Sequence, residues 1–169
     1  MNQTPSVFKC FNMSNIPVST SQLPTWYLDW QSEFDASSLN MTNIEQQALA
    51  SLIPLLLCGE QSAQLVFSNE IERLNNHNKE KYSQAVLALS TIEAEENAHE
   101  LALQSVLMRL PKADNLSKIK RRAQLFYASL GKAETVIEHF ILIRQLDSYV
   151  AIIMSHMARS QLGSQHLVS

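Results

Sequence analysis

Apolar residues recur every three or four positions along most of the chain after residue 41. This spacing places them on one face of an α-helix, so the pattern predicts amphipathic helices and not strands. Helix-breaking residues at Asn75-Asn76, Pro111 and Gly131 divide the pattern into four segments. The predicted helices cover residues 42–76, 78–109, 115–130 and 132–162.

Residues 1–41 show no helical period and are rich in Ser, Thr, Asn and Pro. They contain both tryptophans, Trp26 and Trp30, together with Tyr27 and Phe34. Large aromatic side chains gain most from burial, so we expect this leader to lie over the helices with its aromatic rings buried, in preference to forming an aromatic ligand site. The expected fold is all-α: an extended leader over residues 1–41, packed on an antiparallel four-helix bundle over residues 42–169.

The first predicted helix begins at a Thr42-x-x-Glu45 capping box. Pro54 lies inside it, removes one backbone hydrogen bond and is expected to kink or loosen the helix. Glu60 lies on the inward stripe of this helix, among apolar residues. Glu70, nearer the helix end, is expected at the edge of the stripe, where it reaches water. The stripe comprises Ile53, Leu56, Glu60, Ala63, Phe67, Glu70 and Leu74.

Three of the four predicted inward stripes carry an ionisable residue near the middle of the helix. These residues are Glu60, the pair Glu96 and His99 one turn apart, and Asp147. Helix midpoints meet in an antiparallel bundle, so we expect the four side chains to converge. A buried carboxylate without a partner costs several kcal/mol, and a bound cation is one of the few groups that offsets this cost.

Three carboxylates and one imidazole, without a thiolate, suit iron or manganese. Paired carboxylates can also bridge two metal ions. Glu93, one turn before Glu96, is a candidate for supporting the site or moving a proton, or is simply a solvated flank residue. Taken singly, each residue also has an ordinary explanation. Glu60 can reach water from a stripe edge, Asp147 can pair with Arg144, and His99 can be a hydrogen-bonded core histidine.

Residues 42–109 resemble the first half of the ferritin-like di-iron carboxylate superfamily, which includes ribonucleotide reductase small subunits, N-oxygenases and rubrerythrins. The resemblance rests on Glu60 in Cys-Gly-Glu-Gln-Ser-Ala and on Glu96 and His99 in Ala-Glu-Glu-Asn-Ala-His-Glu. It implies one or two iron ions that react with dioxygen or peroxide. The second half departs from the family pattern, because position 150 is Val and not His. Glu138 falls near where a third-helix ligand is expected.

Charge and composition argue against several classes of function and location. The net charge is −3 with no basic tract, which argues against binding to nucleic acid. The start of the chain lacks the features of a signal peptide, and the longest apolar run, residues 52–58, is shorter than the about 20 residues of a membrane span. We therefore expect a soluble cytoplasmic protein that binds no membrane, with Cys10 and Cys58 as free thiols.

Two classes of function follow from these residues. The first is an iron-dependent oxidoreductase that acts on an unidentified small molecule through Glu60, Glu96, His99 and Asp147. The alternative is a non-catalytic helical module for dimerisation or interaction, in which the metal site is degenerate. In either class we expect a homodimer, because the third predicted helix is too short to cover the faces of its neighbours.

Overall fold

The structure is a computed structural model, and it describes residues 23–78, 80–130 and 135–159. These residues form five helices and no strand, which confirms the prediction of an all-α protein. The helices are α1 (Thr25–Ala36), α2 (Asn43–Asn78), α3 (Ser83–Met108), α4 (Leu116–Leu130) and α5 (Val136–Arg159).

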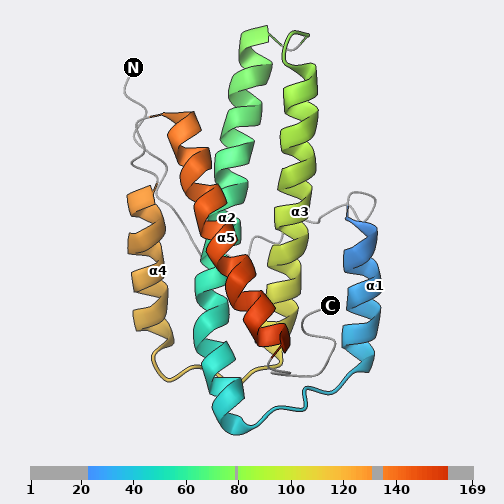
Figure 1. The fold of residues 1–169 in the computed structure, drawn as a ribbon, viewed down its shortest axis with the longest axis vertical. Coiled ribbons are helices and arrows are strands. Elements are labelled where there is room, and N and C mark those ends of the chain that lie inside the picture. The colour runs from blue at the N-terminus through green and yellow to red at the C-terminus, as the bar shows by residue number, and fades with distance from the viewer. Residues whose placement is uncertain (1–22, 79, 131–134, 160–169) are drawn as a thin grey trace.

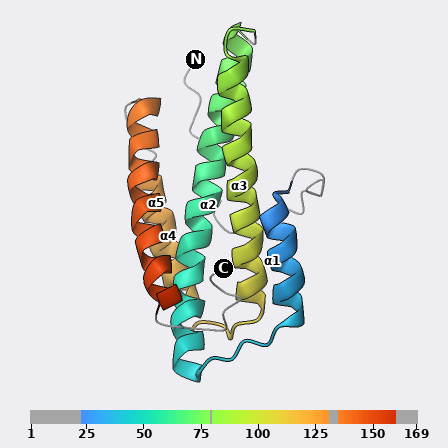
Figure 2. The ribbon, with the colours of Figure 1, turned by 45° about the vertical axis from the view of Figure 1, so that its right-hand side comes forward.

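The two longest helices, α2 and α3, form a central antiparallel hairpin (Figure 1). From α2 onward, successive helices alternate in direction (Figure 1). Helices α4 and α5 lie against α2 on one side of the hairpin, whereas α1 lies against α3 on the other side (Figure 2). The hairpin is therefore the frame to which the other three helices attach.

Helix α2 begins as its capping box predicts. The Thr42 backbone N–H donates to Glu45 Oε2 at 2.7 Å, and the Glu45 N–H donates to Thr42 Oγ1 at 3.3 Å. The helix continues through Pro54 and ends at Asn78, two residues beyond the predicted end. Most of its predicted stripe is buried, which gives the hairpin its core.

The expectation that residues 1–41 lack helix is wrong for Thr25–Ala36, which forms α1. Its buried side chains Tyr27, Trp30 and Phe34 are spaced by three and four residues, so a short helical period was present in the sequence. They pack in one cluster with residues of α2 and α3, as expected for a leader with tucked-in aromatic rings. Residues 1–22 of the predicted leader lie outside the described residues.

The C-terminal end of α1 is held by Arg109, which directly follows α3. The Arg109 guanidinium donates to the carbonyl oxygens of Phe34 at 2.7 Å and Ser37 at 3.1 Å, and to Asp35 Oδ1 at 3.0 Å. It also lies 4.0 Å from the centre of the Phe34 ring. One side chain therefore satisfies the last carbonyls of α1 and ties them to α3.

The structure corrects the expectation that Glu70 reaches water at the stripe edge, because this residue is only 9% exposed. Its carboxylate accepts two hydrogen bonds from Arg73, at 2.7 Å from Nε and 2.6 Å from Nη2. This bidentate ion pair compensates the buried charge and explains why an acid is tolerated at this position.

The inward stripes of α3 and α5 are covered less completely than that of α2. In α3 the stripe residue Ile92 is 41% exposed, whereas Val106 is buried.

The bounds of the last helices differ from the prediction at several ends. Helix α3 begins at Ser83 and not near residue 78. The described part of α5 begins at Val136, where the Glu138 N–H donates to the Thr135 hydroxyl at 3.1 Å. Residues 132–134 and 160–162 of the predicted last helix lie outside the described residues.

Cys58 is disulfide-bonded, which corrects the expectation of a free thiol at this position. The spacing of cysteines along a sequence does not reveal whether their sulfur atoms meet in the fold, so this pairing could not be predicted. Cys10, the other cysteine of the chain, lies outside the described residues.

Helix α2 is long and apolar enough to cross a membrane, judged by its length and composition alone. Its most apolar stretch of 18 residues has a mean hydropathy of 1.3. Of the residues in this stretch, 44% are buried inside the protein. Core helices of soluble proteins pass the same test, so the finding is weak evidence for a membrane.

Candidate metal centre

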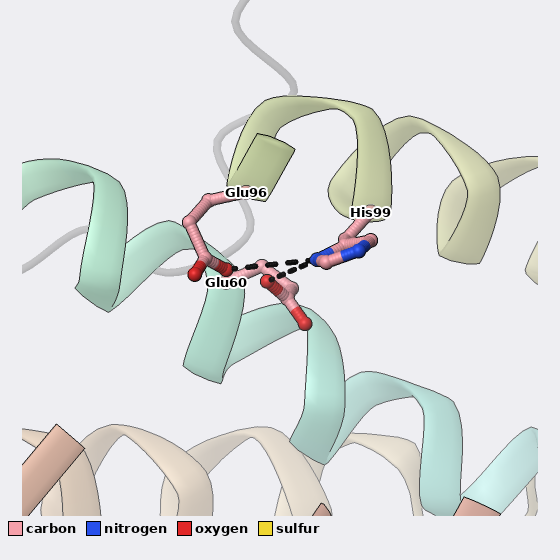
Figure 3. Close-up of side chains that lie close together, drawn as sticks. All are labelled: Glu60, Glu96 and His99. Carbon is pink, nitrogen blue, oxygen red and sulfur yellow. Dashed lines mark ion pairs between the residues drawn. The ribbon is translucent and has the colours of Figure 1, made fainter. Parts of the chain in front are cut away.

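The structure brings Glu60, Glu96 and His99 together where the middle of α2 faces α3 (Figure 3). His99 Nδ1 lies 3.7 Å from Glu60 Oε2 and 3.8 Å from Glu96 Oε2. Glu96 and His99 are one turn apart on α3, so both side chains reach toward α2. Glu60 reaches back from α2 to meet them.

These separations are compatible with a shared metal ion. One ligand atom from each residue lies within 4.8 Å of the other two. Two ligands bound at about 2.0–2.2 Å from one ion are at most roughly 4.4 Å apart. The two separations from His99, 3.7 and 3.8 Å, fall inside that limit, so small side-chain movements would let all three residues bind one ion.

Burial differs among the three side chains. The side chains of Glu60 and Glu96 are 18% and 15% exposed, whereas that of His99 is 49% exposed. The carboxylates therefore lie inside the hairpin and the imidazole closes the cluster at its edge.

The environment shifts the protonation of all three residues. Burial, followed by hydrogen bonding to Glu96, raises the pKa of Glu60 to about 8 although His99 opposes the shift. The neighbouring carboxylates, Glu60 first, raise the pKa of His99 to about 10 against the effect of burial. Burial acts to raise the pKa of Glu96, but hydrogen bonds with His99 and Glu60 outweigh it, and this pKa is lowered. At pH 7 Glu60 and His99 are thus protonated and Glu96 is ionised.

Asp147, the fourth predicted ligand, lies outside this group of three. It belongs to α5, and the residue as a whole is exposed. Partial burial of its carboxyl nevertheless raises its pKa to about 6. The charge of Glu96 adds to this shift, and the charge of His99 opposes it. Asp147 is therefore near enough to interact with the cluster electrostatically, while its role as a ligand remains a prediction.

Tyr127 of α4 borders the site through Gly59, the residue before Glu60. A Cβ atom built on Gly59 would lie 2.7 Å from Tyr127 Oη and 3.2 Å from Cζ, so only glycine permits this approach. The Tyr127 hydroxyl donates to the Leu55 carbonyl at 3.3 Å. Burial raises the pKa of Tyr127 to about 12, and the charges of Glu60 and Asp147 add to the shift. In the sequence, Gly59 beside Glu60 indicated that another helix could approach closely. Nothing in the sequence indicated that Tyr127 makes this contact.

Glu100 is the centre of a hydrogen-bond network that fixes α3 against α2 beside the cluster. Its carboxylate accepts hydrogen bonds from Gln61 at 2.6 Å, Gln64 at 2.8 Å and Gln104 at 2.9 Å. The Gln64 amide also donates to the Glu96 carbonyl at 3.4 Å. The hydrogen bonds of Gln61 and Gln64 therefore join α2 to α3 beside the cluster, and sequence reasoning missed them.

The two further acids considered from the sequence do not join the three-residue group. Glu93 accepts a hydrogen bond from the Ser68 hydroxyl and so forms another contact between α2 and α3. Glu138 lies exposed in the first turn of α5.

Trp26 of α1 was expected to pack on the helices, but the sequence did not reveal that it lies beside His99. Its indole ring centre lies 5.4 Å from that of His99, with an angle of 39° between the ring planes. Its Nε1–H donates to Glu95 Oε2 at 2.7 Å. The side of the imidazole that faces α1 is therefore covered by an aromatic ring.

Comparison with known proteins adds no assignment to this geometry. No protein-family model, curated protein or solved structure matches the chain.

Proposed function

We propose that this protein binds a divalent transition metal ion, iron first and manganese second, through Glu60, Glu96 and His99. The observation that carries the proposal is the convergence of two largely buried carboxylates and one imidazole within 4.8 Å. Oxygen and nitrogen ligands without a thiolate are the set that suits these metals.

Charge balance supports the same proposal. The metal-free cluster holds one ionised carboxylate, one imidazolium and one protonated carboxyl at pH 7. Loss of the protons from Glu60 and His99 would leave two carboxylates and a neutral imidazole, which balance the charge of a divalent ion. The buried site would therefore stay neutral before and after binding, and no charge would be buried without compensation.

We further propose a ferritin-like oxidoreductase as the functional class. The support is the placement of donors on an antiparallel hairpin, with a mid-helix Glu60 on α2 and the Glu-x-x-His pair on α3. A bound iron ion would supply redox chemistry with dioxygen or peroxide. The chain would supply ligands from Glu60, Glu96 and His99, an aromatic cover from Trp26 and a further acid, Asp147. The substrate belongs to the class of small molecules.

The test is metal analysis of protein purified without chelators, followed by titration with Mn²⁺ monitored by electron paramagnetic resonance. We expect stoichiometric binding that His99→Ala weakens by roughly 10-fold or more, because the only nitrogen donor is lost. Glu72→Gln, an exposed change on α2, is the matched control and should bind as the unaltered protein does. Failure to retain Fe²⁺, Mn²⁺ or Zn²⁺ at micromolar concentration would overturn the proposal.

A second candidate function is a non-catalytic dimerisation module, and the apolar surface of α5 favours it. Ile143 on one face of α5 is buried against α2, yet Ile137, Ile141 and Ile152 are 73%, 52% and 55% exposed. A helix that is apolar on opposite faces is usually covered by protein on both faces. We therefore propose a homodimer in which a second copy covers the outer face.

A further inference from the structure

We infer that Trp26 and Glu95 are positioning residues that hold the imidazole of His99 in its ligand orientation. This inference rests on the proposed metal site and adds α1 to it. The proposed partners of His99 are a single divalent ion and the indole ring that lies against the imidazole.

The contacts of Trp26 join α1 to the part of α3 that carries the ligands. The indole Nε1–H donates to Glu95 at 2.7 Å, while the indole ring lies against the His99 ring, with centres 5.4 Å apart. Glu95 and His99 are four residues apart and therefore share one face of α3. One side chain thus bridges two positions on successive turns of the ligand-bearing helix.

His99 needs such support because it is the least buried of the proposed ligands. Its side chain is 49% exposed, so solvent alone would not restrain rotation of the imidazole. The carboxylates of Glu60 and Glu96 face its Nδ1 atom, and the indole limits movement of the ring toward α1. The acids therefore contact the imidazole at Nδ1 and the indole contacts its ring, with Nδ1 directed at the proposed ion.

The indole itself is held in place by the packing of α1. Tyr27, Trp30 and Phe34 anchor the buried face of α1, and Arg109 fixes its C-terminal end. Trp26, at 38% exposed, contributes little to that core. Its hydrogen bond to an acid next to the ligands is therefore better explained by a role at the site than by packing.

The first experiment measures Mn²⁺ affinity in variants of the full chain. Removal of groups that orient a metal ligand typically weakens metal binding 10- to 100-fold, and we expect a loss of about this size in Trp26→Ala and Glu95→Ala. Trp26→Phe keeps a ring over His99 without the hydrogen bond, so it should recover part of the affinity. Tyr149→Ala, an exposed aromatic change on α5, is the control and should leave affinity unchanged.

The second experiment uses fluorescence, because the chain has two tryptophans. Trp30→Phe leaves Trp26 as the emitter, and Trp26→Phe leaves Trp30, which stacks on Phe34 instead. Titration with Co²⁺ should quench emission more strongly in Trp30→Phe than in Trp26→Phe, with the same midpoint as binding measured by dialysis. This difference would place the bound ion beside Trp26, and the affinities of Trp26→Ala and Glu95→Ala then test whether that contact orients His99.

The outcomes separate the two proposals. If the unaltered protein binds none of these ions, the metal site is wrong and this inference fails with it. If it binds Mn²⁺ but Trp26→Ala and Glu95→Ala bind equally well, only this inference fails. Equal quenching of the two single-tryptophan proteins would also overturn it. Should Trp26→Ala fail to fold, Glu95→Ala and Trp26→Phe still decide the matter.

Discussion

Glu60 and His99 hold protons at neutral pH in the metal-free protein, and a metal ion would have to displace both. The pKa of Glu60 is about 8 and that of His99 about 10. Binding therefore competes with two protons below about pH 8 and with one between about 8 and 10. Proton release is consequently the most direct residue-scale signature of the proposed site.

We predict that the apparent affinity for Mn²⁺ rises up to about 100-fold per pH unit between pH 6 and 8, and more gently above. Calorimetry at pH 7 in two buffers of different ionisation enthalpy should report close to two protons released per ion. His99→Ala removes one of the two groups and should lower the release to about one. An affinity independent of pH would contradict the assigned protonation states.

Stability of the metal-free protein should have the opposite pH dependence. The pKa values of Glu60 and His99 are both raised in the folded state, from 4.5 and 6.5, so folding takes up protons at these sites. Their contribution is fully present below the unfolded values and is lost as pH rises through about 8 and about 10. With a chelator present, we predict a melting temperature that falls between pH 6 and 10.

A matched variant isolates this contribution to stability. Glu60→Gln keeps the shape of the side chain but removes the group whose ionisation is penalised by burial. The variant should lose less stability than the unaltered protein between pH 6 and 9, measured by thermal unfolding with a chelator. Parallel stability curves for the two proteins would show that Glu60 is not responsible.

At the scale of elements, the attachment of α1 depends on Arg109. We predict that Arg109→Lys lowers the free energy of unfolding by about 2 kcal/mol, because a lysine cannot reproduce the contacts of the guanidinium. Urea unfolding followed by tryptophan emission measures the change. Arg121→Lys, at an exposed position on α4, is the control and should cost at most about 0.5 kcal/mol. Equal costs would show that Arg109 does not anchor α1.

The contact between α2 and α4 yields a second element-scale prediction. Gly59→Ala should destabilise the protein despite the higher helix propensity of alanine, since the new Cβ would meet Tyr127 Oη at 2.7 Å. In a Tyr127→Phe background that closest atom is absent, so the same change should cost less. A double-mutant cycle should give a coupling of at least about 0.5 kcal/mol. Additive effects would exclude the close contact.

The helical period was enough to predict α2, α3, α4 and the described part of α5 to within about five residues. It also predicted correctly that Glu60, Glu96 and His99 lie together, because all three belong to one helical hairpin. Helix α1 was missed because its period spans only Tyr27 to Phe34 within a polar segment. Asp147 was harder to place, since a stripe fixes the face of a helix but not how closely that helix approaches its neighbour.

The role of the Glu100 network illustrates why the rest could not be predicted. Gln61 and Gln64 look like ordinary surface residues in the sequence, and their partner on α3 is defined only once α2 and α3 are in register. Hydrogen-bond partners far apart in sequence leave no periodic signal. Arg109 escaped notice for the same reason, as did the contact between Trp26 and His99.

At the scale of the whole molecule, the outer face of α5 predicts self-association. Ile137, Ile141 and Ile152 fall within a sector of roughly 60° when successive residues turn by about 100°. We expect a dimer at micromolar concentration in sedimentation equilibrium, and a monomer for the double variant Ile141→Glu with Ile152→Glu. Ile44→Glu, at an 82% exposed position on α2, is the control and should remain dimeric. A monomeric unaltered protein would exclude this dimer.

The location of all three proposed ligands on a single hairpin also has a consequence for biosynthesis. Residues 60–99 lie in two consecutive helices, so no partner for the site has to arrive from the later part of the chain. At translation rates of about 5–20 residues per second, the residues after His99 take several seconds to be made. During that interval the nascent hairpin can already assemble its ligands. Loading with metal at the ribosome, before α4 and α5 have packed against α2, is therefore open to this protein.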